Sequence, residues 1–144
     1  MQLIAKSKSK GAKMSGFINK VVLLGILAKD PEIKMIQSGD NIATLILMVN
    51  DSWENRRTAQ QINKVEYFKV VVFSKSLIKQ IETVIKKGDQ LYIEGQLRVR
   101  KWYDEQKNNH YSVEIVLFSH NGILVLLNNN NIKGELLINQ EALP

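Results

Sequence analysis

The sequence predicts an all-β protein, a five-stranded Greek-key barrel with one helix between its third and fourth strands. Three observations support this fold class. Short segments rich in Val, Leu and Ile recur along the chain, a single segment has helical periodicity, and that segment follows three expected strands and precedes two. With 144 residues, of which 44% are hydrophobic, the chain can build one domain with a buried core. This order of elements is that of an OB-fold, whose closed sheet leaves few exposed edges.

Three strands are expected before the helix. Residues 19–28 are rich in Val and Leu and end at a turn in which Pro31 blocks a further strand. Residues 41–50 form a second apolar strand, and residues 65–73 form the third. The polar residues 51–64 between them are expected to form a long loop or a β-ribbon.

Residues 75–87 have the periodicity of a helix. Their apolar residues share one helical face: Leu77, Ile78, Ile81, Val84 and Ile85. Ser74 or Ser76 can cap the N-terminus of this helix. The lysines at 86–87 suit the negative end of the helix dipole, and Gly88 suits the position that follows the C-terminus.

After the helix, residues 89–102 are expected to form a long fourth strand. A turn at 104–109 leads into the fifth strand at 110–118, and residues 122–127 are a candidate for a short sixth strand. These segments complete the barrel.

The chain is expected to contain one ordered domain, residues 14–127, between two tails. Residues 1–13 carry four lysines and no acid, and they are interpreted either as a flexible basic arm or as the result of a mis-assigned start before Met14. Residues 128–144 open with a run of asparagines and are expected to be poorly ordered. Because the arm holds much of the net charge of +6, the rest of the chain is only mildly basic.

Several classes of function are disfavoured. The chain has no cysteine, so disulfides and thiolate metal sites are excluded. No apolar run approaches the roughly 20 residues of a membrane span. There is no Gly-rich phosphate loop or GxSxG motif, and neither His110 nor His120 has a second ligand at metal spacing. We therefore expect no enzymatic activity, no metal, no cofactor and no membrane partner.

The expected strand at 89–102 has two unlike faces because strand side chains alternate. One face carries Leu91, Ile93, Leu97 and Val99, and the other carries Tyr92, Glu94, Gln96, Arg98, Arg100 and Trp102. The row of Arg98, Arg100 and Trp102 suits a ligand that is both anionic and flat, such as single-stranded nucleic acid. The alternative is a half-buried strand with a solvated charged face.

The third strand repeats this pattern, because Tyr67, Lys69, Val71, Phe73 and Lys75 share one parity. Rings can stack on bases while cations hold phosphates. Basic residues also outnumber acidic ones nine to four between residues 64 and 101, which favours an anionic partner. The alternative is that the rings belong to the core and that the lysines extend along the surface.

Several segments together resemble the bacterial single-stranded DNA-binding proteins over residues 14–127. They are NKVVLLG at 19–25, the turn at 30–32, DSW at 51–53, EYFKVVVFSK at 66–75 and KGDQLYIEGQLRVRKW at 87–102. The resemblance implies a cytoplasmic, nucleoid-associated OB-fold homotetramer without catalytic activity. Such a protein binds and protects single-stranded DNA without sequence preference in replication, recombination and repair. A dimer is the alternative assembly.

The resemblance also assigns roles to residues. It implies that bases stack on Trp53, Tyr67, Phe73 and Trp102, with Trp53 alongside the other rings. It implies phosphate contacts by Lys20, Lys34, Lys69, Lys75, Lys86, Lys87, Arg98 and Arg100.

The chain departs from the family pattern at two places. Phe68 replaces a histidine of the family and is expected to be a core or interface residue. Replication and repair proteins are candidate partners, but the chain ends in GELLINQEALP rather than in the acidic tip, closing with Ile-Pro-Phe, through which the family recruits them. Two alternative functions remain open: a primosome-type OB-fold replication accessory protein, and the OB-fold domain of a small nuclease.

Overall fold

The computed structural model describes residues 16–128 and 131–138, with only the course of the backbone for residue 128 and residues 131–138. The elements, in chain order, are β1 Val21–Leu27, β2 Glu32–Met35, β3 Asn41–Glu54, β4 Gln61–Val72, α1 Lys75–Val84, β5 Gln90–Tyr103, β6 Asn109–Leu117, β7 Ile123–Asn128 and β8 Asn131–Ile138.

Strands β1, β3, β4, β6 and β5 form a closed barrel in that spatial order, because β1 pairs with both β3 and β5. The pairing of β4 with β6 is parallel, through Val70 opposite Ile115 and Val72 opposite Leu117, and the other barrel pairs are antiparallel. With α1 between the third and fourth barrel strands, this topology confirms the predicted five-stranded OB-fold barrel.

The alternation of each barrel strand sends one set of apolar side chains inward. Leu45, Val70, Ile93 and Leu117 are among the fully or almost fully buried side chains that form this core. Helix α1 adds its own apolar face through three buried residues, Leu77, Ile78 and Ile81. Phe68, which replaces the family histidine, is partly buried and packs against the same core.

The start of α1 agrees with the prediction, and its end does not. The Oγ of Ser74 accepts a hydrogen bond from the Leu77 N–H at 3.3 Å, so Ser74 is the N-cap. The helix ends at Val84 with no basic residue in its last turn, so Lys86 and Lys87 lie beyond it. Gly88 has a positive φ of 93° in the turn that follows, where its N–H donates to the Leu27 carbonyl at 2.8 Å.

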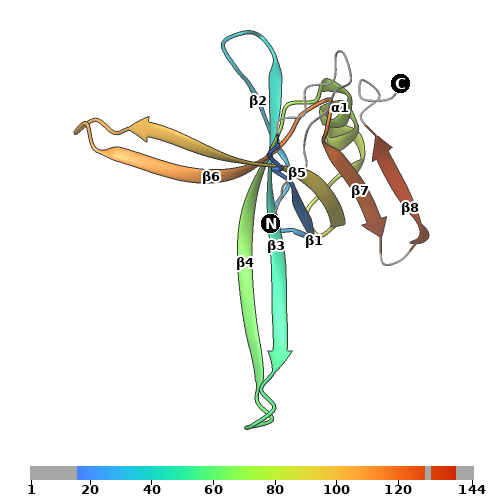
Figure 1. Ribbon diagram of the computed structural model, residues 1–144. Helices are drawn as coiled ribbons and strands as arrows, with labels where there is room; N and C mark the ends of the chain where they lie inside the picture. The colour runs from blue at the N-terminus through green and yellow to red at the C-terminus, as the bar shows by residue number, and fades with distance from the viewer. Residues whose placement is uncertain (1–15, 129–130, 139–144) are drawn as a thin grey trace.

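Two long hairpins leave the barrel in different directions (Figure 1). In the first, β3 and β4 stay paired from Val49 opposite Glu66 to Glu54 opposite Gln61, and we call residues 49–66 the β3–β4 ribbon. The second comprises residues 97–115 of β5 and β6, which we call the β5–β6 arm. The polar segment 51–64 is therefore mainly part of a ribbon, one of the two forms expected for it.

Two strands differ from the expectations. β2 begins directly after Pro31, although this proline is expected to prevent a further strand. The pairing of β2 with β3 starts at Glu32, so the missing N–H of Pro31 costs no hydrogen bond between these strands. β8 lies within the tail that we expect to be poorly ordered, where its backbone pairs with β7. The arm at residues 1–13 and the last six residues, 139–144, lie outside the described residues.

Candidate nucleic-acid interface

Strand pairing places the rings and cations of β4 and β5 on one outer face of the sheet, which continues from the barrel onto the β5–β6 arm. Across the β5–β6 pairing, Arg98 lies opposite Glu114 and Trp102 lies opposite His110. The parallel pairing of β4 with β6 places Val70 opposite Ile115, so Glu114 lies on the same side of the sheet as Tyr67 and Lys69. We call this surface the basic-aromatic face: Tyr67, Lys69, Phe73, Arg98, Arg100 and Trp102, with His110 and Glu114 of β6. The two strands singled out by their alternation thus contribute to one surface.

A buried carboxylate lies at the centre of the basic-aromatic face. Glu114 is 2% exposed, and its two oxygens lie 3.1 Å from Lys69 Nζ and 3.1 Å from Arg98 Nη2. Burial raises the pKa of Glu114, but the hydrogen bonds from Arg98 and Lys69 outweigh it, so the pKa lies below its ordinary value. Glu114 is therefore ionised at neutral pH and holds both cations in place.

Arg98 also contacts an aromatic ring. Its Cζ lies 5.1 Å from the centroid of the Phe73 ring, and that half-buried ring stacks on Phe118 at 5.6 Å. Phe73 follows β4 directly, and its N–H donates to the Leu117 carbonyl at 2.9 Å. A base that approaches Phe73 therefore meets the Arg98 guanidinium at the same place.

Trp102 is held by its cross-strand neighbour. The indole is 44% exposed and stacks on His110 with ring centroids 4.3 Å apart. His110 Nε2 lies 2.8 Å from Asp104 Oδ2, and Asp104 also accepts backbone hydrogen bonds within its turn. The bond with His110 is the largest of the effects that lower the pKa of Asp104. The turn thereby fixes His110, and His110 supports the indole ring.

The structure does not place Trp53 alongside the other rings, contrary to the expectation. In the β3–β4 pairing Trp53 lies opposite Ile62, whereas Tyr67 lies opposite Met48. Ile62 and Tyr67 differ in parity, so Trp53 and Tyr67 lie on opposite sides of the strand pairing. Both remain accessible, with exposed fractions of 49% and 63%.

The other predicted cations lie on other elements. Lys20 Nζ is 2.6 Å from Glu94 Oε1, beside β1, and Lys34 is exposed on β2. Lys75 opens α1 with its Nζ 3.4 Å from Asp40 Oδ1. Lys86 and Lys87 follow the helix and are exposed. The structure therefore groups Lys69, Arg98 and Arg100 with the rings and distributes the remaining five elsewhere.

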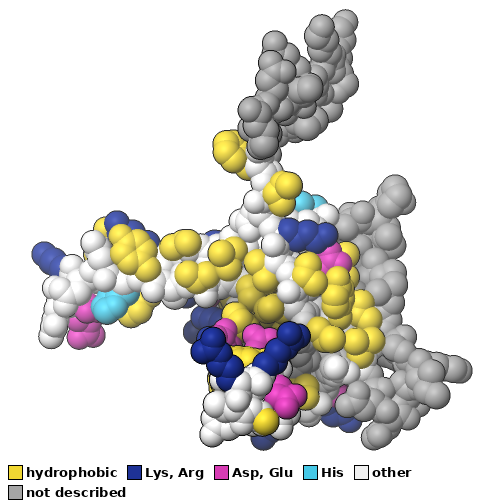
Figure 2. Space-filling model, turned by 60° about the horizontal axis from the view of Figure 1, so that its bottom comes forward, with side chains coloured by type: hydrophobic (Ala, Val, Ile, Leu, Met, Phe, Trp, Pro, Cys, Tyr) yellow, Lys and Arg dark blue, Asp and Glu magenta, His cyan; other side chains and the backbone are white. Residues whose placement is uncertain are grey.

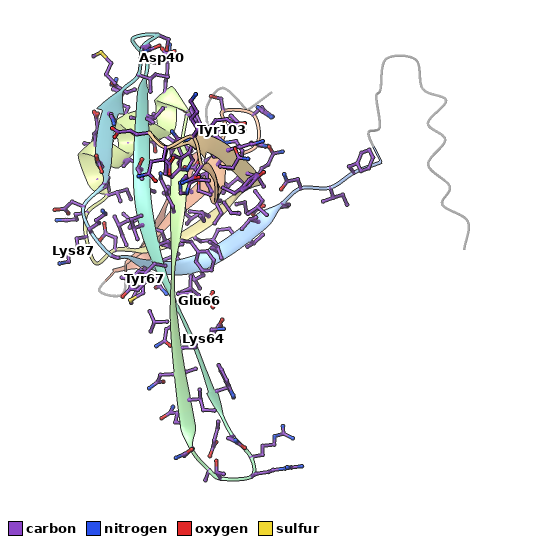
Figure 3. All side chains as sticks on the ribbon, turned by 90° about the vertical axis from the view of Figure 1, so that its left-hand side faces the viewer. Asp40, Lys64, Glu66, Tyr67, Lys87 and Tyr103 are labelled. Atoms are coloured by element: carbon purple, nitrogen blue, oxygen red, sulfur yellow. The ribbon has the colours of Figure 1, made fainter. Side chains whose placement is uncertain are left out.

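Arg56 and Arg57 form a basic site that the strand patterns did not reveal. Both are exposed in the turn at the end of the β3–β4 ribbon, where the Arg57 N–H donates to Asn55 Oδ1 at 3.0 Å. Figure 2 shows Lys or Arg side chains at the end of the ribbon that comes forward, and Figure 3 shows Tyr67, Glu66 and Lys64 following one another along β4 toward that end. The signal available in the sequence was the pair of arginines three residues after Trp53.

The described residues offer neither a metal-binding cluster nor a membrane-spanning helix. Within residues 16–128 and 131–138, no group of three or more His, Cys, Asp or Glu side chains could hold a metal ion. No helix in that same part of the chain has the length and hydrophobicity needed to cross a membrane. A closed barrel with rings and cations on one accessible face is the arrangement of OB-fold proteins that bind nucleic-acid strands.

Comparison with known proteins assigns the family. The chain belongs to the single-strand binding protein family, whose family model matches residues 18–121. It is 42% identical over 121 residues to the single-stranded DNA-binding protein of Rhizobium meliloti (strain 1021), covering 84% of this chain and 70% of the relative. It is 40% identical over 118 residues to that of Rickettsia typhi (strain ATCC VR-144 / Wilmington), covering 82% and 78%.

Solved structures agree with this assignment. A Plasmodium falciparum SSB in complex with ssDNA matches with a TM-score of 0.72 at 30% identity, over 81% of this chain and 100% of that chain. A deletion mutant of the single-stranded DNA-binding protein from Thermus aquaticus matches with a TM-score of 0.62 at 20% identity, over 82% of this chain and 54% of that chain. The second likeness supports the fold alone. The predicted resemblance is thus confirmed at the level of the family.

Proposed function

We propose that this protein binds and protects single-stranded DNA without sequence preference, and that it does so without catalysis in bacterial replication, recombination and repair. The observation that carries the proposal is the basic-aromatic face, where Tyr67, Phe73 and Trp102 lie among Lys69, Arg98 and Arg100. Membership of the single-strand binding protein family supports the same function. The site of action that fits this role is the DNA of the bacterial cytoplasm.

The chemistry of the face accounts for binding without sequence preference. Each stacked base contributes about 1–3 kcal/mol, and every base offers a flat face. Phosphate contacts by Lys69, Arg98 and Arg100 add a term that depends on the backbone charge alone. Since Trp53 lies on the other side of the ribbon from Tyr67, a bound strand has to cross the ribbon edge to reach both rings.

Fluorescence titration with oligo-dT tests the proposal, because both tryptophans are partly exposed, at 49% and 44%. Addition of oligo-dT should quench the emission strongly, and Trp53→Ala and Trp102→Ala should each weaken binding without unfolding the barrel. Absence of quenching in the parent would refute the proposed function. Parent-like binding by both variants would refute the stacking assignment.

Salt dependence gives a matched comparison of cations. Log affinity should fall linearly with log salt, by about 0.7 per phosphate contact for a single strand. Arg100→Ala should reduce that slope, whereas Lys79→Ala, which removes an exposed cation of α1, should leave it unchanged. Equal slopes for the two variants would contradict the placement of the site.

Labelled oligonucleotide incubated with the protein and Mg²⁺ should remain intact, and its cleavage would favour the nuclease alternative.

Self-association is part of the proposal, with a tetramer as the expected assembly and a dimer as the alternative. The outer side of β1 and β7 exposes a group of aliphatic side chains, in which Val22 is 50%, Leu24 49% and Ile123 39% exposed. Exposed apolar patches commonly mark protein interfaces. Leu24→Lys should therefore lower the mass measured in solution, while the surface control Lys79→Glu should not. A parent that sediments as a monomer would refute this part.

A further inference from the structure

The β5–β6 arm has a second face that the proposed function does not use. Pairing places Val99 opposite Val113 and Lys101 opposite Tyr111, on the side of the arm away from Trp102. Tyr103 follows Lys101 on the same side. We call this surface the reverse face: Val99, Lys101, Tyr103, Tyr111 and Val113. Nearer the barrel the same side of these strands forms the core, where Ile115 is buried.

The reverse face is apolar, aromatic and accessible. Val99 is 62%, Tyr103 63%, Tyr111 65% and Val113 58% exposed. Figure 2 shows hydrophobic side chains along the arm that points to the left, and Figure 3 labels Tyr103. Because the arm has only two strands beyond the barrel, no second layer of the described structure covers these side chains.

A single cation sits among the rings of this face. Lys101 Nζ lies 5.6 Å from the centroid of the Tyr103 ring and 5.8 Å from that of Tyr111. None of the ion pairs found between described residues involves Lys101. On the opposite face, by contrast, Glu114 neutralises part of the charge of Lys69 and Arg98. Among the described residues, the reverse face therefore presents two flat rings around one ammonium group that has no carboxylate partner.

The charge of Lys101 distinguishes between a protein surface and a nucleic-acid strand as the partner of the reverse face. An apolar protein surface laid over the patch would bury an ammonium without a counter-ion, which is costly. A second copy of the same face, packed about a two-fold axis, would bring two Lys101 ammonium groups together. A nucleic-acid strand supplies a phosphate for the ammonium and bases for the rings. Charge complementarity thus favours nucleic acid.

We propose that the reverse face is a second contact site for single-stranded DNA, in which bases stack on Tyr103 and Tyr111 and a phosphate pairs with Lys101. The inference rests on the proposed function. Trp102 and Tyr103 are neighbours in the chain but lie on opposite faces, so a strand that leaves Trp102 has to cross only one free edge of the arm to reach Tyr103. The arm is then contacted by DNA on both faces.

The test compares two double variants of the full chain. Tyr103→Ala/Tyr111→Ala removes the rings, and Val99→Ser/Val113→Ser removes apolar surface from the same face without touching the rings. Each is titrated with a short oligo-dT of about 10 nucleotides, which fits one OB fold, and with one several times longer. The titrations are run at a salt concentration at which the parent affinity is measurable. Circular dichroism and the mass in solution are recorded for each protein.

The proposal predicts a loss of affinity that depends on the length of the oligonucleotide. For each ring removed, the affinity of the tyrosine variant for the long oligonucleotide should fall by about fivefold or more. Its affinity for the short oligonucleotide should be nearly that of the parent. The valine variant should bind both like the parent. Lys101→Glu, a surface change that leaves both rings, should reduce the salt slope on the long oligonucleotide. Iodouracil-substituted oligo-dT should cross-link to Tyr103 or Tyr111 under light.

Three outcomes overturn the proposal. Parent-like binding of the long oligonucleotide by the tyrosine variant and by Lys101→Glu would show that the reverse face does not contact DNA. A lower mass in solution for both double variants, with unchanged affinity, would identify a protein interface instead. A parent that does not bind oligo-dT at all would refute the proposed function first, so the two failures are distinguishable.

Discussion

Glu114 is the residue whose substitution tests the structure most directly. Glu114→Gln keeps the size of the side chain and removes its charge, while the two cations that it holds stay in place. Each charge-assisted hydrogen bond contributes about 1.5–3 kcal/mol. The side chains of Lys69 and Arg98 are 43% and 41% exposed, so solvent screening reduces that figure. The amide can still accept one hydrogen bond but turns its NH₂ toward the other cation.

The expected loss in the free energy of unfolding is therefore about 2 kcal/mol at neutral pH. Urea denaturation at one fixed protein concentration measures it, because unfolding of an assembly depends on concentration. Glu82→Gln, at an exposed position of α1, is the matched control and should change stability little.

The pH dependence of this loss provides a check on its cause. The pKa of Glu114 in the folded protein lies below the ordinary value of 4.5. Its contribution is therefore fully present above pH 4.5 and is lost as the pH falls through the folded pKa. The stability difference between parent and Glu114→Gln should shrink over that acidic range. A difference that stays constant from neutral to acidic pH would refute the reasoning.

The same variant should change DNA binding. Without the carboxylate, Lys69 and Arg98 offer their full charge to phosphates. Log affinity should therefore fall more steeply with log salt than in the parent, by about 0.7 for each additional phosphate that the protein neutralises. An unchanged slope would show that Glu114 does not limit the charge offered by the basic-aromatic face.

Two further substitutions test how the barrel is held together. Gly25→Ala should lower the free energy of unfolding by about 1–3 kcal/mol, because a Cβ at this position would overlap the Met48 carbonyl oxygen and lie 2.9 Å from Leu47 Cγ. A variant as stable as the parent in urea would contradict the close approach of β1 and β3. Ser74→Ala removes the N-cap of α1 and should lower the free energy of unfolding by about 1 kcal/mol. Equal melting curves for the parent and Ser74→Ala would contradict the capping role.

The barrel strands and the helix were predictable because each has its own period and its own apolar face. The buried Glu114 was not, since in sequence it is one charged residue in an alternating strand. Its burial depends on the parallel pairing that places Val70 beside Ile115, and no local pattern indicates that pairing. The side of the ribbon on which Trp53 lies likewise depends on register rather than on composition. No local pattern in the polar tail predicts the pairing of β7 with β8 either.

The two hairpins that leave the barrel have a consequence for local opening. The β3–β4 ribbon carries Trp53 and the β5–β6 arm carries Trp102, and beyond the barrel each is a two-stranded ladder that no second layer of the described residues covers. Such segments open at a lower free energy than the core, so their amide hydrogens should exchange through local fluctuations while the barrel stays closed. A ligand that binds only the closed hairpins slows that exchange by mass action. The order of the two hairpins then depends on the concentration of single-stranded DNA, whereas the order of the barrel does not.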